Sequence, residues 1–151
     1  MKKTTILKIE FEISQIDKLL ADTEPLIKLA KNKTPDRIES AALALFLHSF
    51  YGGIENLMKL YFKDRFGKLP TKKDWHKELL NSCFDDFNQR ALFNEDLRDT
   101  LEDYLKFRHF IRTNYNYKIK WEKMEHLVIN INDVWELIKK TLISYITYLS
   151  F

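Results

Sequence analysis

The sequence predicts an all-α protein: an antiparallel bundle of about five helices, folded as a single domain over residues 1–151. The chain contains only three glycines and three prolines, too few turn-forming residues for a β protein with many short strands. Apolar residues make up 45% of the chain and recur at steps of three and four over long stretches, which is the spacing of one helix face. A chain of 151 residues is also long enough to bury a substantial core.

The first helix is predicted from about Lys3 to Lys31. Its apolar residues alternate three- and four-residue steps, as in the seam of a helical bundle: Ile6, Ile9, Ile13, Ile16 and Leu20. Pro25 lies inside this pattern and lacks the N–H that a helical hydrogen bond needs. A kink or break is therefore expected near residues 23–24.

The second helix should begin at residues 34–35, with Thr34 as its cap and Pro35 in the first helical position. It continues to a loop that contains Gly67 and Pro70. Gly52 and Gly53 lie in mid-helix, where each costs about 1 kcal/mol relative to alanine. These glycines indicate close backbone packing, for which a partner protomer is one candidate neighbour.

Three further helices are predicted in the second half of the chain. A short one runs from Trp75 to about Phe84, with Asp74 as its cap. The fourth begins after Asn94 and frays near Thr113, and residues 118–120 are expected to be extended. A single long helix then runs from Trp121 through Leu149, with a wide apolar face.

Composition excludes several functional classes. The net charge of +3 permits RNA binding but is too small to argue for it. The single cysteine, Cys83, excludes an internal disulfide and a Cys-rich zinc site, and it fits a reducing cytoplasm. No uncharged apolar run approaches the roughly eighteen residues that a membrane span needs. A cytoplasmic protein without a membrane segment is expected.

The sequence predicts neither a cofactor nor a metal. No Gly-rich phosphate-binding loop is present. His76 and Glu78 are potential metal ligands, but they lack a metalloprotease spacing or a carboxylate-rich neighbourhood. His48 and Tyr51 lie near one face of the second helix and are interpreted as a hydrogen-bonded core pair.

The fourth predicted helix carries Arg108 in the middle of an apolar stripe, with Arg112 one turn further on. The stripe consists of Leu97, Leu101, Tyr104, Leu105, Ile111 and Tyr115. A guanidinium cannot lose its charge, so a sequestered one needs a carboxylate, an anion or a wet interface. One interpretation is a packed stem whose head reaches solvent or a core glutamate. Glu55 is the candidate carboxylate, the alternative being a solvated surface residue.

The residues that follow favour a functional interpretation. Arg108-His109, four residues and then Asn114-Tyr115 resemble the signature of HEPN domains, in particular of the HepT-like ribonuclease toxins. That signature reads Arg, a polar residue, a short spacer, His, any residue and Tyr. Arg108, His109 and Tyr115 match it, whereas Thr113 stands where the family has His.

The resemblance extends over most of the chain. Four blocks in the same order are similar to one HepT-like subfamily: residues 47–55, 75–80, 104–109 and 121–122. It implies a HEPN-like bundle that dimerises about the signature helix, and a metal-independent endoribonuclease toxin. It also implies a nucleotidyltransferase-like antitoxin as a partner, which can adenylylate the signature tyrosine, here Tyr115.

The resemblance also implies roles for individual residues. Arg108 would face the phosphorane, because its planar fork bridges two oxygens. Proton transfer belongs to the terminal histidine of the signature, with His109 in support. Arg112, Asn114 and Glu55 are candidate supporting residues. Positions 108 and 113 differ by about 140° around a helix, so they converge only if the helix loosens or a second protomer contributes its copy.

The threonine at position 113 leaves the activity open. Thr113 cannot act as a base at neutral pH, which leaves His109, one turn earlier on the same face. Either His109 carries proton transfer alone and slowly, or the chain is a catalytically inactive HEPN dimer that binds RNA, a nucleotide or a protein. A helical adaptor without the HEPN function is the third alternative.

Overall fold

The computed structural model describes residues 3–84, 91–114 and 118–150, and within these ranges the chain is helical without any strand. Its elements are α1 (Lys3–Asn32), α2 (Arg37–Phe66), α3 (Trp75–Ser82), a 3-10 turn η1 (Glu95–Leu97), α4 (Arg98–Thr113), α5 (Trp121–Ile129) and α6 (Ile131–Leu149). The all-α prediction is confirmed. None of the described helices is apolar over a stretch long enough to cross a membrane.

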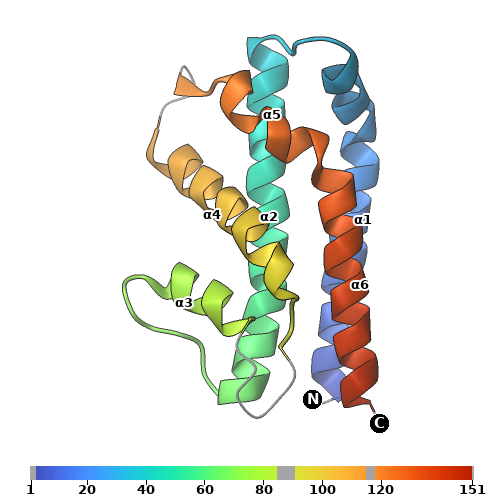
Figure 1. The fold of residues 1–151 in the computed structure, drawn as a ribbon, viewed down its shortest axis with the longest axis vertical. Helices are drawn as coiled ribbons and strands as arrows, with labels where there is room; N and C mark the ends of the chain where they lie inside the picture. Colours follow the sequence, from blue (N-terminus) through green and yellow to red (C-terminus); the bar gives the residue numbers. More distant parts are fainter. Residues whose placement is uncertain (1–2, 85–90, 115–117, 151) are drawn as a thin grey trace.

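Helix α2 is the centre of the bundle. Helices α1, α3, α4 and α5 all pack against it, and α6 contacts α1 and α5. In Figure 1, α1, α2 and α6 run along the long axis, while α4 crosses α2 obliquely and α3 lies beside its C-terminal half. The middle of α2 is fully buried through Phe50, Tyr51, Ile54, Leu57 and Met58. Between these positions, Gly52 lies against Arg108 of α4 and Gly53 against Ile16 of α1.

The start of α2 corrects the sequence prediction by two residues. The N-cap is Asp36, not Thr34, and Pro35 precedes the helix. The Asp36 carboxylate accepts a hydrogen bond from Glu39 N at 2.8 Å, and the Glu39 carboxylate accepts one from Asp36 N at 2.9 Å. This reciprocal capping box satisfies two backbone donors at once, which Thr34 cannot do. The end at Gly67, with φ of 79°, is as predicted.

Two other boundaries differ from the prediction. Helix α1 continues through Pro25 without a break, because Ile27 and Ala30 beyond it are buried in the core and hold the last turns in place. The predicted long last helix is divided at Asn130 into α5 and α6. The Asn130 side chain and backbone N–H both donate to His126 O, at 2.9 and 3.3 Å, and Asn130 is the C-cap of α5 as well as the N-cap of α6.

Gly53 explains how closely α1 approaches α2. A Cβ atom at this position would lie 2.8 and 2.9 Å from the Cγ1 and Cδ1 atoms of Ile16, which is closer than side-chain carbons pack. The prediction of close packing at the two glycines is confirmed, and at Gly53 the neighbour belongs to the same chain. The glycine therefore contributes to the fold of the protomer itself.

Candidate functional site

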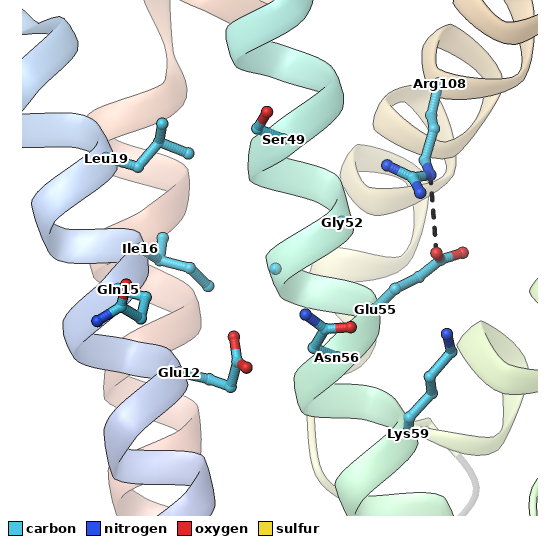
Figure 2. A pocket seen from close by; sticks show the side chains of 11 residues that line it. Glu12, Gln15, Ile16, Leu19, Ser49, Gly52, Glu55, Asn56, Lys59 and Arg108 are labelled. Carbon is cyan, nitrogen blue, oxygen red and sulfur yellow. Dashed lines mark ion pairs between the residues drawn. The ribbon is translucent and has the colours of Figure 1, made fainter.

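Arg108 projects from α4 onto α2. Its Nη1 donates a hydrogen bond to the backbone carbonyl of His48 at 2.7 Å. Its Nε lies 3.7 Å from Oε1 of Glu55, an ion-pair distance but too long for a hydrogen bond. Figure 2 shows this pair, with the guanidinium directed toward the carboxylate. The predicted contact between Arg108 and Glu55 is confirmed.

Gly52 provides the space in which the guanidinium lies. A Cβ atom there would be 3.0 Å from Nη1 of Arg108, which is tighter than almost all real contacts. Gly52 lies one helical turn after His48, whose carbonyl Arg108 binds. Gly52 and Gly53 thus have different neighbours: Arg108 for the first and Ile16 for the second.

Glu55 holds two groups from different helices. Its side chain is only 3% exposed, and a carboxylate so buried requires compensating partners. Oε1 faces Arg108 of α4, while Oε2 lies 2.5 Å from Nδ1 of His76 in α3. His76 was considered in the sequence only as a metal ligand, and its contact with Glu55 was missed. Only the docking of α3 against α2 brings these residues together, and the sequence gives no signal for that docking.

Arg108 borders two clefts. The α3–α4 cleft, about 750 Å³, is lined by His76, Arg108, His109 and Arg112 among others. Its described lining contains five lysines or arginines against two acidic residues. The α1–α2 cleft, about 440 Å³, lies on the other side of the guanidinium and includes Glu12, Asn56 and Lys59 (Figure 2). The excess of cations makes the α3–α4 cleft the better place for an anion.

Helix α4 separates the two ends of the signature. Arg108 turns toward α2, whereas Thr113 is exposed and its Oγ1 donates a hydrogen bond to His109 O at 3.0 Å. Asn114 donates its side-chain amide to Phe110 O at 2.9 Å, one turn back. Because α4 stays helical up to Thr113, position 113 does not meet Arg108 within the described protomer. Tyr115 lies outside the described residues.

His48 is a third histidine near Arg108, since its backbone carbonyl accepts the hydrogen bond from Nη1 of Arg108. The predicted hydrogen-bonded pair is wrong: neither His48 Nδ1 nor the Tyr51 hydroxyl has a hydrogen-bond partner within the described chain, although both atoms are buried. Burial, together with the positive charges of Arg108 and Arg112, lowers the pKa of His48. Burial likewise raises the pKa of Tyr51. Burial and the two arginines therefore both favour a neutral imidazole at position 48.

The site is suited to binding a phosphate beside groups that transfer protons. Arg108 is held by one hydrogen bond and one carboxylate, and its Nη2 has no hydrogen-bond partner among the described residues. His76 and His109 line the same cleft. Within the described ranges, no three His, Cys, Asp or Glu side chains are arranged to hold a metal ion.

Comparison with known proteins identifies the family. The family model for HepT-like proteins matches residues 42–149. The match spans the glycine pair and Glu55 of α2, all of α3, and the Arg108 signature in α4. Neither curated proteins nor solved structures gave a match. A match over this much of the sequence, on an all-helical fold, shows that the chain belongs to the HepT-like, HEPN-type family.

Proposed function

We propose that this protein is a HepT-like toxin of a toxin–antitoxin module, a metal-independent endoribonuclease attenuated by the loss of the signature histidine. The observation that carries the proposal is the position of Arg108. Its guanidinium is fixed by His48 O and Glu55 at the edge of a cleft with an excess of lysine and arginine. Fixed cations with spare donors are what a ribonuclease needs to hold a scissile phosphate.

The proposed reaction is attack by a 2′-hydroxyl on the adjacent phosphorus. The O2′–P bond forms, the P–O5′ bond breaks, and the products are a 2′,3′-cyclic phosphate and a 5′-hydroxyl. Arg108 stabilises the charge on the non-bridging oxygens of the phosphorane. His109 is the residue of the signature that remains able to transfer a proton, since a threonine hydroxyl cannot do so near neutral pH.

A homodimer and an antitoxin belong to the same proposal. Position 113 faces away from Arg108 within one protomer, so a second copy of α4 is the means of bringing the two ends of the signature together. Tyr115, the tyrosine of the signature, is the proposed site of adenylylation by a nucleotidyltransferase-like partner. A small nucleotidyltransferase gene beside this one would support that partnership. Sedimentation of the chain as a monomer at micromolar concentration would count against the dimer.

A second candidate function follows from Thr113. Its hydroxyl is engaged with the backbone of its own helix and offers no proton-transfer group. If His109 does not compensate, the same cationic cleft supports binding without cleavage. The chain would then be a catalytically inactive HEPN dimer that binds RNA, a nucleotide or a protein partner.

Cleavage of RNA in the presence of EDTA tests the proposal. Arg108→Ala removes the guanidinium, and loss of a charge-assisted contact to a phosphorane should reduce the rate by about a hundredfold or more. Arg37→Ala removes an exposed arginine in the first turn of α2 and is the matched control. Wild-type cleavage that is unaffected by Arg108→Ala would refute the site. Binding of RNA without cleavage would favour the second function.

A further inference from the structure

We infer that His76 is the general base of this site and that Glu55 positions it, so that α3 supplies the proton-transfer group that the signature lacks at position 113. The inference rests on the proposed ribonuclease function and adds a residue from outside the signature. Its basis is the arrangement of three groups around one buried carboxylate: Arg108, Glu55 and His76.

The carboxylate fixes the orientation of the imidazole. Glu55 Oε2 lies 2.5 Å from His76 Nδ1, so in the neutral ring the proton sits on Nδ1 and is donated to Glu55. The unprotonated nitrogen is then Nε2. A carboxylate on Nδ1 also stabilises the imidazolium that forms when Nε2 accepts a proton, which is the role of the acid in a catalytic triad.

The ring is further held from its face. Trp75 stacks on His76 with ring centroids 3.5 Å apart and an interplanar angle of 30°. Two contacts, one at the edge and one at the face, restrict rotation of the imidazole. A proton-transfer group held in this way keeps its geometry before the substrate arrives.

The free side of His76 distinguishes it from a purely structural histidine. A core histidine has both nitrogens bonded or enclosed, whereas Nε2 of His76 has no hydrogen-bond partner in the described chain. The side chain is 25% exposed and lines the α3–α4 cleft with Arg108 and His109. A phosphate bound by Arg108 would thus have a histidine from α3 and another from α4 in the same cleft.

His76 and His109 together account for both proton transfers of the reaction. Nε2 of His76 takes the proton from the 2′-hydroxyl as O2′ bonds to phosphorus. His109, in its protonated form, gives a proton to O5′ as the P–O5′ bond breaks. Water-mediated return of the proton from His76 to His109 restores both residues, so no metal or other reactant is consumed.

Paired measurements of cleavage and binding test the inference. His76→Gln keeps an amide donor for Glu55 but cannot accept a proton. His126→Ala is the control, because His126 is exposed on α5, away from the lining of the cleft. We expect His76→Gln to cleave RNA about a hundredfold more slowly or worse. It should bind a 2′-O-methyl RNA, which lacks the nucleophile, within about threefold of wild type.

The pH dependence provides a readout that a structural role would not change. In wild type the cleavage rate should fall at low pH because protonated His76 cannot act as a base, and this acid limb should disappear in His76→Gln. His76→Gln that cleaves within threefold of wild type would overturn the inference while leaving the proposed function intact. Equal losses of binding and cleavage would also overturn it. A wild-type chain that cleaves no RNA would overturn the proposed function and the role of His76 together.

Discussion

The two adjacent glycines of α2 offer a test that separates function from stability. Gly52→Ala places a Cβ atom 3.0 Å from Nη1 of Arg108, so the guanidinium must move by a few tenths of an ångström or more. Gly53→Ala places its Cβ atom against two carbons of Ile16 and does not touch Arg108. The substitutions are chemically identical and one residue apart.

The magnitudes differ because the neighbours differ. Alanine gains about 1 kcal/mol over glycine in a helix, and weakening the charge-assisted bond from Arg108 to His48 O costs up to about 1.5–3 kcal/mol. For Gly52→Ala the terms largely offset, and the free energy of unfolding should change by less than about 2 kcal/mol. Cleavage should fall about ten- to a hundredfold, because catalysis is sensitive to small displacements of a positioned group.

Gly53→Ala should affect the free energy of unfolding more than the cleavage rate. Ile16 is 2% exposed and packed in the core, so the added methyl group strains the α1–α2 contact, at a typical cost of about 1–3 kcal/mol before the helix gain. Urea denaturation followed by circular dichroism gives the stability, and initial rates on RNA give the activity of the folded fraction. A folded Gly52→Ala variant that cleaves RNA as fast as wild type would refute the role assigned to the Arg108 position.

Three other predictions use separate features. Thr113→His should raise RNA cleavage by up to about a hundredfold, because it restores the general acid–base residue of the signature. The melting temperature should not change. No gain in a folded dimer would show that the site was lost more broadly than at one residue. The pKa of His48 is lowered in the folded chain, so the unfolded chain binds a proton more readily than the folded one. The contribution of neutral His48 to the free energy of unfolding is therefore present above the ordinary histidine pKa of 6.5 and is lost as pH falls. When denaturation is measured between pH 7 and 5, the free energy of unfolding should therefore decline less for His48→Gln than for wild type. Incubation with ATP and the neighbouring nucleotidyltransferase should add adenylate to Tyr115, detected by mass spectrometry, and an unmodified Tyr115 would argue against that partnership.

The spacing of apolar residues and the positions of helix-ending residues predicted the architecture well. Apolar spacing located α1, α2 and α4, and Gly67 marked the end of α2 because its left-handed geometry needs glycine. Boundaries that depend on side-chain competition were less predictable. Asp36 caps α2 in place of Thr34, and the last helix is divided at Asn130, whose side chain donates to the His126 carbonyl. These helix boundaries depend on which of several neighbouring polar side chains forms the hydrogen bond to the backbone.

The site was predictable where it follows from one helix and its charge. An arginine on an apolar stripe required a carboxylate, and Glu55 was the correct partner. The contacts of His48 and His76 were not predictable, because they depend on how α2, α3 and α4 pack together. Separation along the sequence was a poor guide to contact, since His76 and Glu55 are 21 positions apart and yet lie within hydrogen-bond distance.

The chemistry of the cut ends reports directly on whether a 2′-hydroxyl attacks the phosphate held by Arg108. Wild-type protein is incubated with a defined RNA in EDTA, and the fragments are analysed by mass spectrometry. Attack by the 2′-hydroxyl at a phosphate held by Arg108 predicts 2′,3′-cyclic phosphate and 5′-hydroxyl ends, which Arg108→Ala should form at least about a hundredfold more slowly. Fragments that carry 3′-hydroxyl and 5′-phosphate ends, or that form only when Mg²⁺ is restored, would contradict metal-independent attack by the 2′-hydroxyl.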